Sequence, residues 1–340
     1  MKHLFLIGAL FLSGIAMAQK AVVESPDNML KVTVDCKEGK LSYVIDYNGK
    51  RMLNESPLGL NANIGNYADN LSYQRHEITK VTDSYKLRNS KQSNISYEAN
   101  RLEYLIKNGD GAEMTLVLQV SNNNVALCYE LSKKGETGSV RIMNEVTGYN
   151  FPQQTTTFLT PQSDAMIGWK RTKPSYEEEY KADRPMNERS QFGHGYTFPC
   201  LFRVGEDGWV LLSETGVDSR YCASHISDYE NGLYTIAFPM PEENNGNGTV
   251  EPAFSLPGAT PWRTFTIGSD LKPIVETTIP WDVVKPRYES DKIYKYGKGT
   301  WSWILWQDNS INYDDQVKFV DLANAMGFNY TLVDNWWDTN

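Results

Sequence analysis

The sequence predicts a mainly β protein, with a large antiparallel β-sandwich (a super-sandwich) followed by the first strand, helix and strand of a (β/α)8 TIM barrel. Two observations predict this fold class. From about residue 21 to residue 279, hydrophobic and polar residues alternate in short runs between turn signals. About forty residues at the end then read as apolar run, helical period and apolar run, the order of a parallel βαβ unit. Such a unit cannot bury its own faces, so we expect a truncated chain, the front part of a larger enzyme.

The first eighteen residues predict a cleavable signal peptide. Lys2 precedes an apolar run, residues 4–15, and Ala16-Met17-Ala18 has the small-x-small pattern of a signal-peptidase site. The run is too short to span a bilayer, and Gln19 stands where a lipid-anchored protein would have cysteine. We therefore expect cleavage after Ala18 and an exported protein, periplasmic or secreted, without membrane insertion.

Residues 19–280 are the predicted sandwich domain. Asn48-Gly49 follows the alternating run 41–47 and is typical of a type I′ hairpin turn. Glycine-containing turns at 108–111 and 205–208 indicate two more hairpins. Strands are predicted at 30–35, 41–47, 102–107, 114–120, 125–131, 200–204, 209–212, 233–238 and 264–267.

The pattern changes near Pro280, where the alternation of period two stops. Residues 281–298 are interpreted as a linker, and residues 299–340 as the incomplete start of the catalytic barrel. The apolar run Trp301–Trp306 predicts the first barrel strand, and residues 329–333 the second.

A helix is predicted between these two strands, over residues 313–326. Asn312 is a suitable N-cap, and Asp314 and Asp315 stand in the first turn, where the helix dipole favours acids. Gly327 is placed to end the helix in the left-handed conformation.

Composition narrows the range of partners. A net charge of −9 argues against nucleic acids and anionic membrane surfaces and leaves neutral sugars open. The 9 Trp and 20 Tyr residues suit stacking on sugar rings, although β-sheet cores are also rich in aromatic residues.

The four cysteines have no metal-binding spacing, which argues against a zinc site. Two states remain open for them, disulfides in one of three pairings or buried free thiols.

Three adjacent acids, Glu177, Glu178 and Glu179, form one candidate site. Neighbouring carboxylates repel one another unless water or a cation neutralises them, and hard cations such as Ca²⁺ take oxygen ligands. Taken alone, these residues favour a solvated loop over a calcium site.

Two further residues are candidates. Glu214, at the end of an apolar strand, either reaches a site or marks the point where the strand enters water. His194, between two glycines, is either an accessible ring or a hydrogen-bonded structural residue.

Asp334 directly follows the second barrel strand, where a carboxylate is costly unless it binds something. Trp336 and Trp337 beside it form either a sugar platform or a cover for the barrel rim. Asp308 and Asn309 hold the equivalent place after the first strand.

No catalytic motif is evident in the sequence. It contains no Ser-His-Asp motif, no phosphate loop and no convincing pair of glycosidase carboxylates, so the catalytic residues are unknown.

The order of parts and several motifs resemble glycoside hydrolase family 97, known for exported, calcium-dependent α-glucosidases and α-galactosidases. Residues 25–32 resemble the family's opening strand, and Tyr176-Glu-Glu-Glu-Tyr180 its aromatic-Glu-x-x-Tyr motif. Similar segments are also found at 197–214, at 299–303 in the first barrel strand, and at 327–337 in the second.

The resemblance implies a Ca²⁺ cofactor with Glu177 as one metal ligand. Asp334, Trp336 and Trp303 are the residues expected to contact the substrate. It also implies the amino-terminal part of a hydrolase that cleaves α-linked glucosides or galactosides in an oligosaccharide or glycan. The catalytic residues are then expected beyond Asn340, so the fragment alone should be inactive.

Two other readings stay open. The first is a non-catalytic carbohydrate-binding β-sandwich protein, and the second is a different exported barrel glycosidase with a β-sandwich leader. The predicted strand and capped helix after residue 299 argue against the first, because a linker does not carry a buried-strand pattern.

Overall fold

The computed structural model describes residues 19–88, 90–165, 178–288, 291–334 and 337. The chain divides into two compact units, residues 1–285 and residues 286–340. Each unit is described by itself.

A four-stranded antiparallel sheet opens the first unit, and its strands alternate buried and solvent-facing residues as predicted. Asn48 and Gly49 both have positive φ, at 47° and 73°, as a type I′ turn requires. The strands are β1 (Ala21–Glu24), β2 (Leu30–Lys37), β3 (Lys40–Tyr47) and β4 (Lys50–Leu58).

A ten-stranded antiparallel sheet forms most of the described part of this unit. β21 (Gly258–Ala259) pairs with β10 outside the main strand order. In spatial order the other strands are β14 (Lys181–Pro185), β13 (Thr155–Leu159), β16 (Cys200–Val204), β17 (Gly208–Thr215), β22 (Trp262–Gly268), β10 (Asn124–Leu131), β9 (Glu113–Val120), β8 (Asn94–Lys107) and β7 (Ser72–Lys86).

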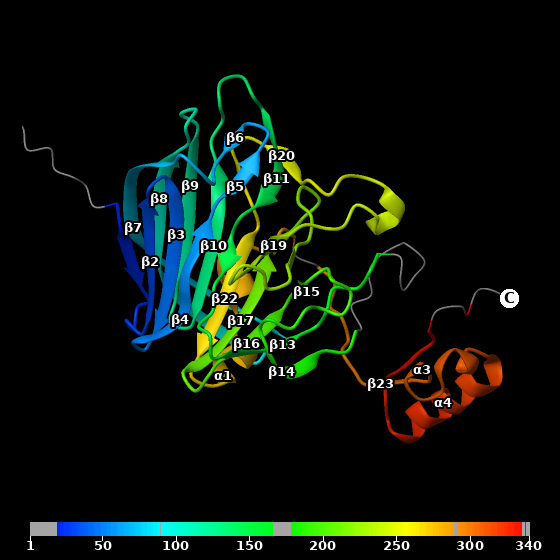
Figure 1. Ribbon diagram of the computed structural model, residues 1–340. Helices are drawn as coiled ribbons and strands as arrows, with labels where there is room; N and C mark the ends of the chain where they lie inside the picture. Colours follow the sequence, from blue (N-terminus) through cyan, green and yellow to red (C-terminus); the bar gives the residue numbers. More distant parts are fainter. Residues whose placement is uncertain (1–18, 89, 166–177, 289–290, 335–336, 338–340) are drawn as a thin grey trace, which may run out of the picture. The chain divides into compact units, whose positions relative to one another are not determined.

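The first sheet packs face to face on the β7–β10 half of the large sheet, which makes a β-sandwich (Figure 1). Tyr43 on β3 meets Phe265 on β22 edge to face, with ring centroids 6.0 Å apart. Both side chains are buried, as are Val32 and Leu118 from the two sheets. Each large apolar side chain buried in this way stabilises the fold by roughly 1.5–3 kcal/mol.

Two smaller antiparallel sheets and three short helices complete the described part of the first unit. One sheet consists of β20 (Ala253–Ser255), β11 (Ser139–Glu145), β5 (Leu60–Ala62) and β6 (Gly65–Asn66), and the other of β12 (Gly148–Tyr149), β19 (Tyr234–Ala237), β18 (His225–Ile226) and β15 (Tyr196–Thr197). The helices are η1 (Glu243–Gly246), α1 (Lys272–Glu276) and α2 (Ile279–Val283).

The second unit contains a parallel strand pair, as the sequence predicts. β23 (Gly299–Trp301) pairs in parallel with β24 (Tyr330–Leu332), and α4 (Tyr313–Ala325) connects them. Asn312 caps α4 by accepting a hydrogen bond from the Asp315 backbone N–H at 3.0 Å. Gly327 has φ +64°, and Phe328 N–H donates to Ala323 O at 2.8 Å, so the helix ends in a Schellman motif.

The prediction of a strand over Trp301–Trp306 is wrong beyond its first residue. α3 (Trp303–Trp306) and η2 (Gln307–Ser310) follow β23 instead. The backbone N–H groups of Leu305 and Trp306 donate to Ser302 O at 3.0 and 2.9 Å, which closes a helical turn. Short apolar runs fit a strand and a helix equally well, so the pattern could not distinguish them.

The four cysteines, all in the described part of the chain, are free thiols. Burial raises the pKa of Cys36, Cys128, Cys200 and Cys222, which suppresses the reactive thiolate. Within the described residues, no helix combines the length and the apolar character needed to cross a bilayer.

Candidate functional site

The carboxyl ends of β23 and β24 carry the sequence-predicted residues that the structure describes, Asp334 and Trp303. Predicted residues Glu177 and Trp336 lie outside the described residues. The Trp301 indole N–H donates to Asp334 Oδ2 at 2.9 Å, and the Trp303 indole N–H donates to Asp308 Oδ1 at 2.8 Å. The two indole rings stack, with centroids 5.7 Å apart and planes 20° apart.

This arrangement joins two carboxylates through a pair of stacked indoles at one edge of the parallel strands. Trp301, which the sequence reading did not select, connects Asp334 to Trp303. Each carboxylate receives an indole donor that orients it, and the indole faces offer the apolar surface that sugar rings stack on. The arrangement is therefore suited to holding a hydroxyl-rich ligand.

Two of the three predicted acids in the sandwich loop are described. Glu178 is half-buried and Glu179 is exposed, and β14 follows them. The nearby cations Lys181 and Arg184 already pair with Glu188, each at 2.7 Å, and these bonds hold the pKa of Glu188 below its ordinary value. In the part of the chain that the structure describes, no three His, Cys, Asp or Glu residues are grouped to share a metal ion. Glu178 and Glu179 are too few to form a calcium site by themselves, and the predicted ligand Glu177 lies outside the described residues.

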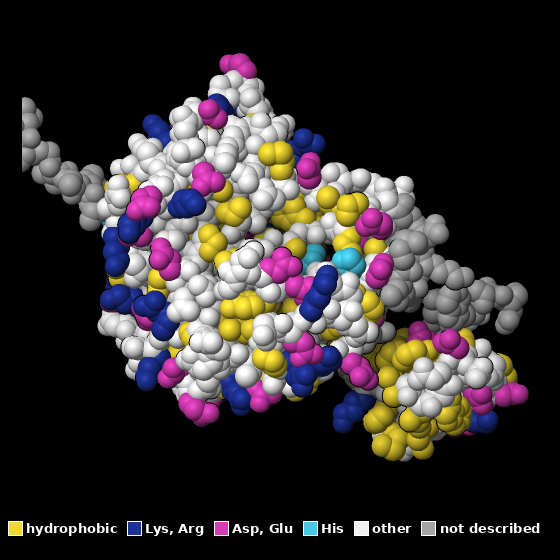
Figure 2. Space-filling model, in the orientation of Figure 1, with side chains coloured by type: hydrophobic (Ala, Val, Ile, Leu, Met, Phe, Trp, Pro, Cys, Tyr) yellow, Lys and Arg dark blue, Asp and Glu magenta, His cyan; other side chains and the backbone are white. Residues whose placement is uncertain are grey.

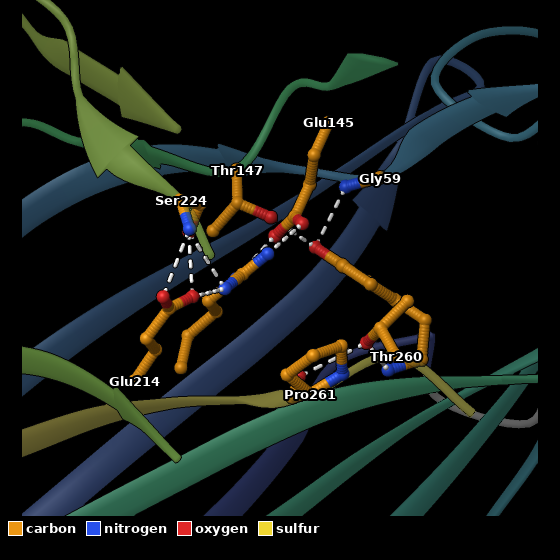
Figure 3. Close-up of polar contacts among 9 residues, drawn as sticks. Gly59, Glu145, Thr147, Glu214, Ser224, Thr260 and Pro261 are labelled. Atoms are coloured by element: carbon orange, nitrogen blue, oxygen red, sulfur yellow. Dashed lines mark hydrogen bonds and ion pairs between the residues drawn. The ribbon is translucent and has the colours of Figure 1, made fainter. Parts of the chain in front are cut away.

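A buried ion cluster joins the ten-stranded sheet to the smaller sheet that contains β11 (Figure 3). Arg263 on β22 donates from Nη2 to Glu145 Oε2 at 2.6 Å and from Nε to Glu145 Oε1 at 3.1 Å. Its Nη1 donates to Glu214 Oε2 at 2.5 Å. Burial alone would lower the pKa of Arg263, but the charge and hydrogen bonds of Glu145 hold that pKa well above its ordinary value.

Glu214 is therefore neither exposed nor free. Its carboxylate accepts from the Ser224 backbone N–H at 2.8 Å, from the Ser224 hydroxyl at 2.7 Å and from Arg263. The interpretation that Glu214 marks the strand's exit into water is wrong, because Arg263 and Ser224 replace the water. Both oxygens of Glu214 are thus bonded within the cluster.

The neighbouring polar groups in Figure 3 are also paired. Tyr129 Oη lies 2.6 Å from Thr147 Oγ1 and accepts from the Gly59 backbone N–H at 2.9 Å. The Tyr129 backbone N–H donates to Thr260 Oγ1 at 3.1 Å. The polar groups drawn in Figure 3 are therefore hydrogen-bonded within an otherwise apolar core.

Sequence reasoning missed Arg263 and Glu145. One signal was available, because Arg263 stands in the apolar strand Trp262–Gly268, and a charge there requires a partner. The identity of that partner could not be predicted from the sequence, because Glu145 lies 118 residues away.

Comparison with known proteins places this β-sandwich in a class of carbohydrate-active enzymes, the glycoside hydrolases. The family model described as "Glycosyl-hydrolase 97 N-terminal" matches residues 23–286, which is more than half of the chain. The chain belongs to this family.

Similar proteins cover nearly all of the chain. A crystal structure of a β-arabinopyranosidase matches with 61% identity and a TM-score of 0.90 over 94% of this chain and 51% of that chain. A "probable retaining alpha-galactosidase" of Streptomyces bingchenggensis (strain BCW-1) is 24% identical over 90% of this chain and 44% of its own length. A family 97 enzyme (E480Q) in complex with panose, from Pseudoalteromonas sp. strain K8, has a TM-score of 0.76 at 19% identity, over 94% of this chain and 48% of that chain.

The chain thus spans about half the length of these relatives. Residues 23–286 form the amino-terminal domain that is typical of this glycoside hydrolase family. The prediction of a mainly β fold is confirmed.

Proposed function

We propose that this chain is the amino-terminal part of an exported glycoside hydrolase that acts on glycosides of α-galacto configuration, with β-arabinopyranosides as its preferred substrates. The observation that carries the proposal is the 61% identity with a β-arabinopyranosidase over 94% of the chain. At that identity, the residues of the sandwich that approach a substrate are expected to be largely shared.

The two substrate names agree in stereochemistry. In the L series, a β-arabinopyranoside has the ring configuration of an α-galactopyranoside without the exocyclic hydroxymethyl group. The sequence left α-glucosides and α-galactosides open as substrates. The arabinopyranosidase and galactosidase relatives favour the galacto configuration at C4.

The second unit supports the view that the chain continues into a barrel. Parallel strands are normally covered on both faces. Here apolar side chains of the strand pair and its helices stay solvent-exposed, among them Leu305, Val320, Leu322, Met326 and Leu332. Further strand-helix units of the same protein are the expected cover, and they would bring the catalytic acids to the edge where Asp334 lies.

Calcium is the second part of the proposal. Glu177 would supply one oxygen ligand, and residues outside this sequence would supply the others. A calcium ion at such a site polarises or orients bound oxygen groups. Within this chain, Asp334 and Trp303 would contact the sugar.

The substrate proposal is tested by hydrolysis of aryl glycosides by the full-length protein. We expect kcat/KM to be highest for the β-L-arabinopyranoside, lower for the α-D-galactopyranoside and lowest for the α-D-glucopyranoside. A loss of one hydroxymethyl contact changes such ratios by roughly 10–200-fold. A preference for the glucoside, or hydrolysis of none of the three, would overturn the proposal.

The calcium proposal is tested separately with Glu177→Gln and a matched control, Glu179→Gln, in the same acidic run. Glu177→Gln should shift the calcium concentration that half-activates the enzyme upward by tenfold or more. Glu179→Gln should leave it unchanged, because Glu179 is exposed. Identical calcium titrations for Glu177→Gln and the wild type would show that Glu177 is not a ligand.

A further inference from the structure

A cavity of about 210 Å³ lies in the first unit, between the sheet β12-β19-β18-β15 and the end of β17. Its lining includes Gln162, Thr197, Phe198, Glu214, His225 and Glu243. Figure 2 shows histidine and acidic side chains beside a hollow on this face of the sandwich. The cavity is smaller than the roughly 300–1,000 Å³ of sites for drug-sized ligands, so it suits a single ring.

Gln162 gives the first sign of a ligand. The residue is 4% exposed, and it lines the cavity. A buried amide needs hydrogen bonds to replace those that it loses to water on folding. The amide offers a ligand both donors and an acceptor.

The backbone holds Gln162 in place. Its N–H donates to Gly195 O at 2.9 Å. Gly195 has φ +82°, and a Cβ there would stand 1.9 Å from Ile226 O, so only glycine fits. The amide at the cavity is therefore presented by a fixed strand and turn.

His225 offers a second polar group. The ring is 6% exposed, and burial lowers its pKa to about 4 despite its hydrogen bond to the backbone of His194. The imidazole is consequently neutral near pH 7. A neutral imidazole keeps one ring nitrogen that can accept a hydrogen bond.

The charges in the cavity exclude several kinds of ligand. Glu214 and Glu243 make the lining acidic, which opposes anions. The oxygens of Glu214 are occupied by Arg263 and Ser224, and in the described residues no group of three metal ligands occurs here. A neutral ligand with both donors and acceptors remains, and the Phe198 ring gives it an apolar surface.

We propose that this cavity of the sandwich binds one neutral pyranose unit of a glycan. The choice of a sugar as the neutral ligand rests on the proposed glycosidase function. Gln162 and His225 would bind its hydroxyl groups, and Phe198 would pack on its C–H face.

The test is binding of methyl α-D-galactopyranoside and L-arabinose to the full-length protein. Crystals of the wild type soaked in either sugar should show a ring in the cavity with hydrogen bonds to Gln162. In solution, Gln162→Leu should raise the Kd of this site by tenfold or more. The matched control Gln191→Leu, on an exposed glutamine, should leave Kd unchanged.

An empty cavity in the soaked wild-type crystals would overturn the proposal, and so would an unchanged Kd for the Gln162→Leu protein. The crystal result does not depend on the folding of any variant. It also differs from failure of the proposed function, because an enzyme that hydrolyses none of the aryl glycosides can still hold a sugar in this cavity.

Discussion

Arg263 Nη2 lies 2.6 Å from Glu145 Oε2, and neither side chain is more than 1% exposed. The pair joins β22 of the ten-stranded sheet to β11 of a smaller sheet. Glu214, opposite Arg263 in the β17–β22 register, adds a second carboxylate. The cluster therefore fixes how two sheets meet within the core.

Replacing Glu145 by Gln should destabilise the protein strongly. The change leaves a buried arginine with one charged partner instead of two, and breaking buried ion pairs typically costs about 3–5 kcal/mol. We expect a loss of about 3 kcal/mol in the free energy of unfolding, measured by urea denaturation.

The control for this prediction is Glu98→Gln. Glu98 pairs with Lys80 at 3.7 Å on the surface, with both side chains more than half exposed. Such pairs contribute at most about 1 kcal/mol. Equal losses for Glu145→Gln and Glu98→Gln would show that the buried cluster is not a special determinant of stability.

His225 should make stability depend on pH. Its folded-state pKa is lowered by burial to about 4, below the unfolded value of about 6.5. Between these values the unfolded chain binds a proton that the folded chain does not, so stability rises with pH across this window. The shift corresponds to about 3 kcal/mol, lost as pH falls from about 6.5 to 4.

The measurement compares the wild type with His225→Gln by urea denaturation at several pH values. The variant should lose about 2–3 kcal/mol less than the wild type between pH 7 and pH 4.5. Above pH 7.5 the two stability curves should run parallel. Parallel curves over the whole range would mean that the His225 ring is protonated equally in both states.

Local signals predicted much of the fold. The Asn48-Gly49 turn and the N-cap Asn312 act over a few residues, and the structure has both. β7 carried a weaker signal, because this edge strand has no fully buried residue, and only scattered side chains such as Val81 and Tyr85 pack against the apolar residues beside it.

The candidate sites could be predicted only in part, because the sequence pattern reports local structure and not contacts between distant segments. Asp334 was selected from its place after a predicted strand, whereas Trp303 was expected inside one. The cavity at Gln162 was not predicted, since its lining comes from segments that span residues 162–243 and meet only through the sheet order. Pairings over such distances leave no periodicity in the sequence.

Tyr85→Phe should expose the cost of a buried carboxylate. Tyr85 Oη donates to Asp282 Oδ1 at 2.6 Å, and Thr278 Oγ1 donates to Asp282 Oδ2 at 3.1 Å. Burial raises the pKa of Asp282, and the two donors oppose this rise. Removing the tyrosine hydroxyl should raise that pKa further and cost about 1.5–3 kcal/mol at pH 7.

This cost should shrink as pH falls, because the protonated carboxyl no longer needs a donor for a charge. Urea denaturation at pH 7 and at pH 4 measures both effects. Tyr288→Phe is the control, since Tyr288 is 89% exposed and should change stability by less than about 0.5 kcal/mol. A pH-independent loss for Tyr85→Phe would assign the effect to packing instead of charge.

The two ends of α4 should each carry measurable local stability. Asn312→Ala removes the side-chain acceptor of the Asp315 N–H and should cost about 1 kcal/mol. Gly327→Ala places a side chain at φ +64° and should cost a similar amount, roughly 1 kcal/mol. Both losses are measured by hydrogen exchange in the intact protein, where each variant should exchange its α4 amide protons faster than the wild type. Asn324→Ala, within the helix, is the control and should leave exchange unchanged or slow it, because alanine favours helix. If all three variants exchange alike, the caps do not determine where this helix begins and ends.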